Sequence, residues 1–197
     1  MEYQLINPIN KNYEPIEQVL TNRGIALEDL FHYLNTTEED NLPFLLIKNI
    51  TEAASLLIKH LAGNGKIYIQ VDSDCDGYTS AAVLLNYLHK WVPSIVENKF
   101  YYDFHEGKQH GINMNSIAEG TSLVIAPDSS SNDYEIHKTL VDRGIDVLVI
   151  DHHLADHESE YACIVNNQLC DYPTKSLSGV GMVYKVCQCL DSLNHIE

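Results

Sequence analysis

Hydrophobic positions along the chain follow two different periodicities, and the change between them comes near Gly65. Before it, apolar side chains recur at helical spacing, most clearly over 50–61, and the polar run 35–41 is typical of a loop. After it, short apolar runs predict strands at 67–71, 99–102, 122–126, 147–150 and 162–165. Helical patterns separate or follow these runs at 80–91, 132–141 and 180–193.

This alternation of strands and helices predicts an α/β fold with a mainly parallel β-sheet flanked by helices. Residues 1–65 are expected to form a helical N-terminal extension, and residues 66–197 the domain that carries the chemistry. Hydrophobic residues make up 45% of the chain and charged residues 20%, which argues for a globular protein. No run approaches the roughly 20 apolar residues of a membrane span, and the first residues lack the layout of a signal peptide. We therefore expect a cytoplasmic protein without a membrane partner.

Acidic side chains dominate the charged residues: the net charge is −16, which by itself disfavours a phosphate-rich partner. Their positions reverse that inference, because several follow predicted strands directly: Asp72, Asp74, Asp76, Asp128 and the run Asp151-His152-His153. The carboxyl ends of parallel strands meet at one edge of a sheet, where these carboxylates would repel one another unless protons or cations neutralised them. Mixed carboxylate and imidazole ligands favour Mn²⁺ or a similar transition metal, whereas carboxylates alone would favour Mg²⁺.

Each of these elements also has a simpler interpretation. The run 72–77 resembles the start of a calcium-binding loop, but the glutamate required at its twelfth position would fall at Val83. Asp128 alone could cap a helix, and His152 and His153 alone could lie on the surface. The five cysteines are odd in number and lack a CxxC pair, which argues against a disulfide framework or a structural zinc site. The joint placement of acids and histidines after three strands therefore carries the hypothesis of a metal site.

Together, these residues resemble the first three motifs of the DHH phosphoesterases. The motifs stand in this chain as Asp72-x-Asp74-x-Asp76-Gly77, Asp128 and Asp151-His152-His153. The three-aspartate form is similar to RecJ, the single-strand-specific exonuclease, because the pyrophosphatase and cyclic-dinucleotide branches begin with a histidine where this chain has Tyr68. The runs 22–24, 105–111 and 178–181 also look RecJ-like.

The resemblance implies a phosphodiesterase that hydrolyses single-stranded DNA from an end, with a place in DNA repair and recombination. Water activated by two Mn²⁺ ions, or by Mg²⁺, would attack the phosphorus in line. The metal ligands implied are Asp72, Asp74, Asp128 and His152. Asp128 would bridge the two ions, and His153 would face the scissile phosphate, so the catalytic set would be Asp74, Asp128, His152 and His153.

Other residues would support this centre or bind the substrate. Asp76 and Asp151 would orient loops and metal ligands from behind. His105, Lys108 and His110 are candidates for contacting phosphates, although an exposed loop of this kind is as often simply solvated. Ser178 and Gly179 could cradle a phosphate at a helix N-terminus, or form a tight turn where that helix packs.

Two departures from the family pattern affect the interpretation. Gln70 stands where many RecJ proteins have a histidine, which would alter metal preference or rate. The family also has a further metal-binding aspartate downstream of residues 178–181 and then a domain that grips nucleic acid, whereas this chain ends at Glu197. We therefore expect a shortened chain, a proteolytic fragment or a naturally split protein that works with a partner chain.

Two other functions compete with a single-strand exonuclease. A small-substrate phosphoesterase of the same superfamily would cleave short oligonucleotides or cyclic dinucleotides, but Tyr68 disfavours that branch. A catalytically silent replication scaffold would not need the acids and histidines of the three motifs, which this chain retains.

Overall fold

The computed structural model describes residues 7–105 and 110–194, which fall into two compact units, Met1–Leu42 and Pro43–Glu197. In the first unit, α1 (Pro15–Asn22) and α2 (Leu30–Leu34) are accompanied by 3-10 turns at Leu27–Asp29 and Glu38–Asp40. Pro15 occupies the first helical position of α1, where a missing backbone N–H leaves no hydrogen bond unmade. This part of the chain is thus built from short helices, and the polar run 35–41 contains a single turn of 3-10 helix.

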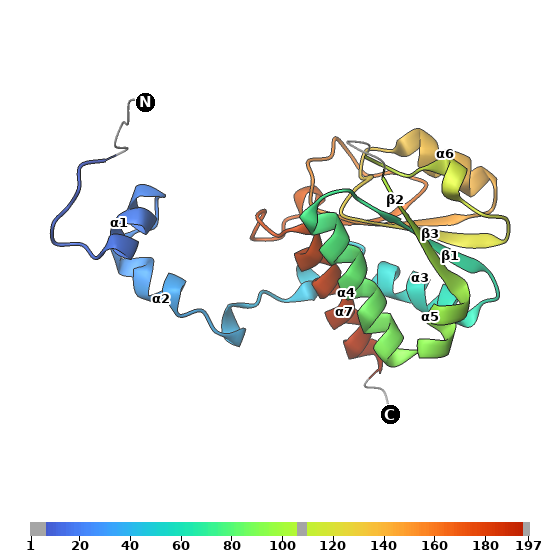
Figure 1. Ribbon diagram of the computed structural model, residues 1–197, viewed down its shortest axis with the longest axis horizontal. Helices are drawn as coiled ribbons and strands as arrows, with labels where there is room; N and C mark the ends of the chain where they lie inside the picture. The colour runs from blue at the N-terminus through green and yellow to red at the C-terminus, as the bar shows by residue number, and fades with distance from the viewer. Residues whose placement is uncertain (1–6, 106–109, 195–197) are drawn as a thin grey trace. The chain divides into compact units, whose positions relative to one another are not determined.

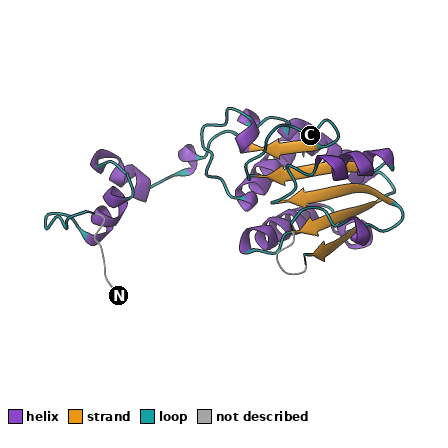
Figure 2. Ribbon diagram, turned by 90° about the horizontal axis from the view of Figure 1, so that it is seen from above, coloured by secondary structure: helices purple, strands orange, loops and turns teal. Residues whose placement is uncertain are grey.

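Five parallel strands form the centre of the second unit, in the order β2-β1-β3-β4-β5 (Figure 2). Their bounds are β1 (Lys66–Val71), β2 (Phe100–Phe104), β3 (Thr121–Pro127), β4 (Asp146–Asp151) and β5 (Cys163–Asn166). Each strand lies on an apolar run of the sequence, so the predicted α/β fold is confirmed.

Helices cover both faces of this sheet (Figure 1). One face carries α3 (Ile50–Ala62), α4 (Cys75–Trp91), α5 (Pro93–Lys99) and α7 (Gly179–Asn194). The other face carries α6 (Tyr134–Asp142), which packs on β4. On the first face, α7 packs against both α3 and α4. Among the described residues, no helix is long and apolar enough to cross a membrane.

Two helices differ from the sequence prediction. Helix α4 begins at Cys75 rather than near residue 80, because Asp74 Oδ1 accepts the Gly77 N–H at 2.9 Å and caps the first turn. The acidic run after β1 therefore crosses directly from strand to helix. Helix α5 was not predicted, since its seven residues are too short to show a clear apolar period, although Pro93 stands at its first turn.

Strands β1, β3, β4 and β5 are buried on both faces, which explains why they read as continuous apolar runs, whereas the edge strand β2 is partly exposed. On the α6 side, Tyr68, Val124 and Val147 pack with Leu140 of α6. Neighbouring strand residues such as Ile69 and Ile125 alternate to the opposite face and are fully buried as well. A sheet shielded in this way leaves its polar chemistry to the strand ends.

Helix α3 belongs to the unit that contains the sheet, although the sequence had placed residues up to 65 in the N-terminal extension. It packs against α7 and β5. Its last turn is tied down by Lys99 Nζ, which donates to the carbonyl oxygens of His60 at 3.0 Å and Leu61 at 2.8 Å. His60 Nε2 lies 2.8 Å from Asp146 Oδ2 at the start of β4.

Candidate metal centre

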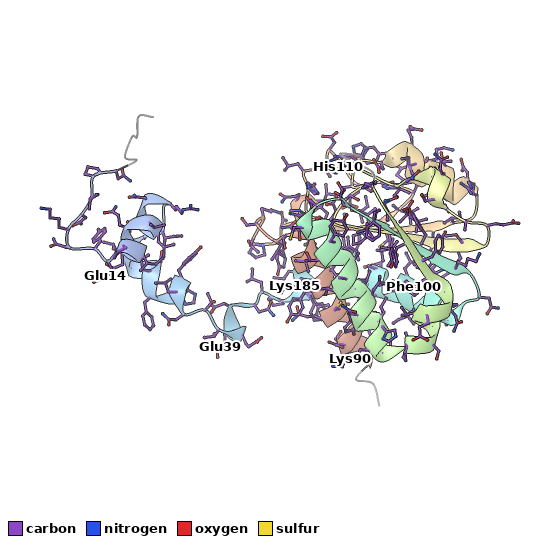
Figure 3. All side chains as sticks on the ribbon, viewed as in Figure 1. Glu14, Glu39, Lys90, Phe100, His110 and Lys185 are labelled. Atoms are coloured by element: carbon purple, nitrogen blue, oxygen red, sulfur yellow. The ribbon has the colours of Figure 1, made fainter. Side chains whose placement is uncertain are left out.

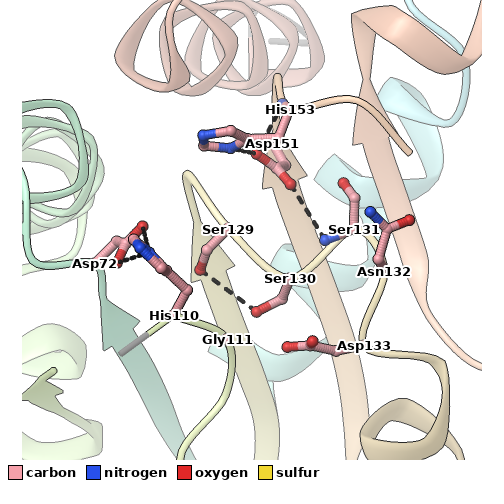
Figure 4. A pocket seen from close by; sticks show the side chains of 10 residues that line it. All are labelled: Asp72, His110, Gly111, Ser129, Ser130, Ser131, Asn132, Asp133, Asp151 and His153. Atoms are coloured by element: carbon pink, nitrogen blue, oxygen red, sulfur yellow. Dashed lines mark hydrogen bonds and ion pairs between the residues drawn. The ribbon is translucent and has the colours of Figure 1, made fainter. Parts of the chain in front are cut away.

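The strand order places a crevice between the ends of β1 and β3. After β2 the chain crosses back over β1 to form β3, so the loops that leave β1 and β3 run in opposite directions. Asp72 follows β1, Asp128 follows β3, and Asp151 is the last residue of β4. Figure 4 shows Asp72 and Asp151 at this edge, with the Ser129–Ser131 loop between them. The tertiary structure therefore brings together the acids that the sequence placed after separate strands.

Asp128 is the most deeply buried acid of this edge. Its residue is fully shielded from solvent, and neither carboxylate oxygen has a hydrogen-bond partner among the described residues. The nearest basic atom is His152 Nε2, 3.1 Å from Asp128 Oδ1. Burial, followed by the charges of Asp76 and Asp74, raises the pKa of Asp128 to about 8. A buried carboxylate that lacks hydrogen-bond donors is stabilised when a cation occupies its vicinity.

Asp128 is held by close packing in a strained backbone conformation. Its φ of 77° lies in the left-handed region, and Ser130 two residues later has φ 79°. The backbone N–H of Asp128 donates to the Ile150 carbonyl at 2.7 Å, which ties the end of β3 to β4. The first residue of α7, Gly179, packs against the carboxylate so closely that only a glycine fits there. Such strained conformations persist where the surroundings over-determine them.

Asp76 joins the first turns of α4 and α7. Its Oδ2 accepts the N–H of Gly179 at 2.7 Å, and its Oδ1 accepts the N–H of Val180 at 3.1 Å. A carboxylate at a helix N-terminus is favoured by the helix dipole and by the unpaired backbone donors. Asp76 Oδ2 also lies 3.6 Å from His152 Nε2, so this carboxylate contacts both the start of α7 and that imidazole.

Asp151 holds the two histidines that follow β4. Its Oδ1 accepts the N–H groups of His152 at 2.7 Å and His153 at 3.2 Å, and also the ring Nδ1–H of His153 at 2.8 Å. Burial alone would raise the pKa of Asp151, but the hydrogen bonds from His153 and from Ser131 N–H lower it to about 2. The same hydrogen bond, opposed by partial burial and aided by nearby acids, raises the pKa of His153 to about 9. Without a bound cation this pairing favours the protonated His153 ring, and among the described residues Asp151 engages only its Nδ1.

Asp72 is paired with two histidines of the run 105–111. Its Oδ1 lies 3.0 Å from His105 Nδ1 and 3.1 Å from His110 Nδ1. His105 is buried, and its Nε2 bonds to the carbonyl oxygen of Gly111. The His110 ring is more exposed and lines the crevice (Figure 4). Lys108, the third phosphate-contacting candidate of this run, lies outside the described residues.

Three side chains have ligand atoms close enough to share one cation. One ligand atom each from Asp128, His152 and His153 lies within 4.8 Å of the others. A carboxylate beside two imidazoles suits Mn²⁺ or another transition metal. Asp72 and Asp74 are not in this group, because Asp72 pairs with His105 and Asp74 caps α4. The burial and unpartnered oxygens of Asp128 fit a divalent cation at this position.

Ser178 and Gly179 form the N-terminus of α7. Ser178 Oγ accepts the N–H of Gly181 at 3.3 Å, in the manner of a helix cap. The N–H groups of Gly179 and Val180 point to Asp76. The backbone donors that the sequence offered to a phosphate are thus engaged by a carboxylate of the chain itself, and a phosphate-binding role for Ser178 and Gly179 stays a prediction.

The crevice is lined by polar residues that the sequence analysis did not single out. A hollow of about 280 Å³ lies between Asp72, His110, Asp151 and His153, and the Ser129–Ser131 loop forms its wall (Figure 4). Asn166 supports this wall, because its Nδ2 donates to Ser131 Oγ and to the His153 carbonyl, both at 2.9 Å. The polar run that follows Asp128 directly was the available signal.

The comparison with known families bears on the same residues. The profile of the DHH family, N-terminal domain, matches residues 66–197, the part of the chain that contains all three acidic motifs. The chain belongs to the DHH family.

Relatives within the DHH family carry exonuclease names. A protein of Bacillus subtilis (strain 168), provisionally named as an SPbeta prophage-derived single-strand DNA-specific exonuclease, YorK, is 42% identical over 192 residues. That match covers 97% of this chain and 32% of the relative. The single-stranded-DNA-specific exonuclease RecJ of the same organism is 31% identical over 183 residues, or 89% of this chain and 23% of that protein. This DHH chain therefore spans about a third or less of these two relatives.

Two solved structures share the fold. Exonuclease RecJ bound to manganese superposes with a TM-score of 0.67 and 22% identity, over 79% of this chain and 40% of that one. RecJ from Thermus thermophilus in complex with Mn²⁺ gives a TM-score of 0.62 and 22% identity, over 85% and 25% of the two chains. At this identity, the likeness shows a shared DHH fold.

Proposed function

We propose that this chain is the metal-binding part of a nuclease that hydrolyses single-stranded DNA from an end, using two divalent cations. Mn²⁺ is the preferred ion and Mg²⁺ its substitute, and the setting is the cytoplasm, in DNA repair or recombination. The support comes from the DHH family membership and from relatives named as single-strand DNA exonucleases.

One observation carries the proposal: the buried carboxylate of Asp128, which accepts no hydrogen bond among the described residues. It is fully buried, lacks hydrogen-bond donors among the described residues and has its pKa raised to about 8 by burial and by Asp76 and Asp74. A structural carboxylate would be expected to hold donors, as Asp151 and Asp76 do nearby. An acid kept without them, beside an imidazole, is arranged for a cation.

The remaining ligands follow from position. Asp128 and His152 would hold the cation that the geometry favours, and Asp72 and Asp74, at the end of β1, would complete a second position. Divalent cations at such a centre activate water and stabilise the charge that develops on the phosphate oxygens during displacement. Asp76 and Asp151 would fix His152 and His153 through the contacts already described.

His153 would act on the substrate directly. Its Nδ1–H is held by Asp151, which leaves Nε2–H to donate to a non-bridging phosphate oxygen. Because its pKa is raised to about 9, the ring would bring a positive charge to the developing negative charge of the transition state. His110, at the exposed rim, and Lys108 would contact flanking phosphates, whereas His105 is buried with both ring nitrogens engaged by Asp72 and Gly111 and does not fit that role. Ser178 and Gly179 would join them only if Asp76 released the N–H groups at the start of α7.

The two competing functions are distinguished by their substrates. A small-substrate phosphoesterase would act on dinucleotides or cyclic dinucleotides in preference to long strands, and a silent scaffold would cleave neither. Because the chain spans 32% of its prophage relative, we propose that a further domain or a partner chain supplies the remaining metal ligand and the grip on nucleic acid. The 197 residues alone would then bind metal but cleave poorly.

The test uses the longest native form with end-labelled single strands, duplexes and dinucleotides, each with and without Mn²⁺. We expect Mn²⁺-dependent release of products from the single strands and loss of that activity in Asp128→Asn. Asp142→Asn, an exposed acid on α6 that pairs with Lys138, is the matched control and should be fully active. Cleavage that survives Asp128→Asn, or a preference for dinucleotides, would refute the proposal.

A further inference from the structure

An apolar groove runs between α4 and the edge strand β2, beside the metal centre. Tyr78, Tyr102 and Phe104 form its walls, and it measures about 350 Å³. The floor consists of aliphatic side chains: Val71, Ala81, Ala82 and Leu85. We refer to these seven residues as the aromatic groove. Phe100, labelled in Figure 3, marks the start of the strand that bounds it.

The rings of the aromatic groove are exposed yet ordered against one another. Their exposed fractions are 46% for Tyr78, 55% for Tyr102 and 44% for Phe104. The ring centroids of Tyr78 and Phe104 lie 5.4 Å apart, and those of Tyr102 and Phe104 lie 5.4 Å apart in an edge-to-face arrangement. Clustered exposed aromatic side chains mark a binding surface, because water contact with so much apolar area is unfavourable.

The groove adjoins the metal centre along three stretches of backbone. Val71 of the floor precedes Asp72, and Phe104 precedes His105, whose ring bonds to Asp72. Tyr78 lies in the first turn of α4, where its N–H donates to the Asp74 carbonyl at 3.1 Å. These rings therefore lie within reach of the nucleotides next to a phosphate that contacts the acids of the crevice.

The distribution of charge also bears on which molecule the aromatic groove can bind. The chain has a net charge of −16, yet no lining residue of the aromatic groove is charged. A polyanion would be repelled by most of this surface, whereas the flat faces of its bases would meet mainly apolar atoms here. Aromatic side chains stack on bases of any sequence, and they need bases whose faces are uncovered, as in a single strand.

We propose that the aromatic groove binds the unstacked bases of a single-stranded nucleic acid while the phosphates of the same strand contact the metal centre. This inference rests on the proposed function and deepens it, because it names the part of the chain that distinguishes single strands from duplexes. In a duplex the base faces are covered by neighbouring pairs, so a duplex gains nothing from these rings.

Binding of labelled oligothymidylate, followed by fluorescence anisotropy in EDTA, tests this without cleavage. An abasic strand of equal length carries the same phosphates without bases and serves as the second probe. The double variant Tyr102→Leu/Phe104→Leu keeps the groove apolar but removes two aromatic faces. Tyr102→Phe keeps the ring, and Tyr184→Leu removes an exposed tyrosine of α7 outside the groove.

We expect wild type to bind oligothymidylate more tightly than the abasic strand, and the double variant to lose about tenfold or more of that affinity. Affinity for the abasic strand should not change, and Tyr102→Phe and Tyr184→Leu should behave as wild type. An unchanged melting temperature and Mn²⁺ response would show that the double variant is folded. Equal binding of both probes by wild type, or wild-type affinity in the double variant, would overturn the inference.

The proposed nuclease activity and the proposed base site are tested separately. Base-dependent binding that the double variant loses, without Mn²⁺-dependent cleavage in any form, would refute the proposed nuclease and leave the base site standing. Cleavage with no dependence on the groove would refute the base site alone.

Discussion

Gly179 lies directly against Asp128: a Cβ built on Gly179 would fall 2.1 Å from Asp128 Oδ1. The first turn of α7, far downstream in the chain, thus sets the position of the acid that ends β3. The two elements can approach this closely only because Gly179 has no side chain.

Gly179→Ala should therefore displace either Asp128 or the start of α7. We expect a loss of about 1–3 kcal/mol in the free energy of unfolding, typical of overpacking, together with weaker Mn²⁺ binding. Urea unfolding and calorimetric titration with Mn²⁺ measure the two effects. Gly181→Ala is the control, because its Cβ would meet Leu177 Cδ2 at an ordinary 3.5 Å. Equal behaviour of the two alanine variants would contradict the close-packing argument.

Mn²⁺ should raise the melting temperature of the chain. Binding to the folded state alone contributes about 2.7 kcal/mol at a hundredfold excess over Kd. For a chain of this size that corresponds to roughly 5–10 °C by differential scanning calorimetry. Mg²⁺ should give a smaller shift at the same concentration.

Asp128→Asn should abolish this shift and, without metal, raise the melting temperature at pH 8, because it removes a buried charge that lacks donors among the described residues. Asp142→Asn should leave both unchanged, since that side chain is exposed. A full Mn²⁺ shift in Asp128→Asn would show that the cation binds elsewhere.

His153→Gln should separate catalysis from metal binding. The ring is held by Asp151 and projects its Nε2 to the crevice, so we expect cleavage by the longest active form to fall by about 10²–10³-fold. Mn²⁺ content, measured by atomic absorption on the same preparations, should largely persist because Asp128 and His152 remain. His157→Gln, an exposed histidine of the same loop, controls for surface changes. Metal loss in His153→Gln as complete as in an Asp128 variant would make His153 a metal ligand instead.

His137 on α6 should make stability depend on pH. It is fully buried, neither ring nitrogen has a hydrogen-bond partner among the described residues, and burial lowers its pKa below 6.5, opposed by Asp133 and the Ser130 backbone. The folded state therefore binds fewer protons than the unfolded state, so the free energy of unfolding decreases as pH falls through 6.5.

His137→Leu should remove that contribution. The melting temperature of His137→Leu minus that of wild type should be larger at about pH 5.5 than at about pH 8. At pH 8 a neutral imidazole is replaced by an apolar side chain at little cost. His157→Leu, at an exposed position, should show no such pH-dependent difference. A constant difference between His137→Leu and wild type at both pH values would contradict this role.

Local sequence pattern was sufficient for the sheet. Strands β1, β3, β4 and β5 were predictable because both of their faces are buried, so each is a short, continuous apolar run; the edge strand β2, which is partly exposed, was indicated by its aromatic residues. Helix α5 and the early start of α4 were missed, since seven residues carry too weak a period and the capping of α4 by Asp74 interrupts the apolar pattern. The acids at the ends of β1, β3 and β4 were predictable as a group, because parallel strands place their carboxyl ends at one edge.

Side-chain pairing at that edge depended on tertiary structure alone. Position after a strand did not by itself distinguish Asp72, Asp74, Asp76, Asp128 and Asp151; their separate roles as metal ligands or supporting residues were implied only by the family resemblance. In the fold, Asp151 accepts hydrogen bonds from His153, and Asp72 pairs with His105 and His110. Asp76 accepts the N–H of Gly179 at the start of α7. Asp128 alone of these four acids has no hydrogen-bond donor among the described residues. These differences arise from contacts between segments far apart in the chain, whose distances no local pattern encodes. The sequence therefore determined which residues gather at this edge, and only packing decided which carboxylate is left without hydrogen-bond donors among the described residues.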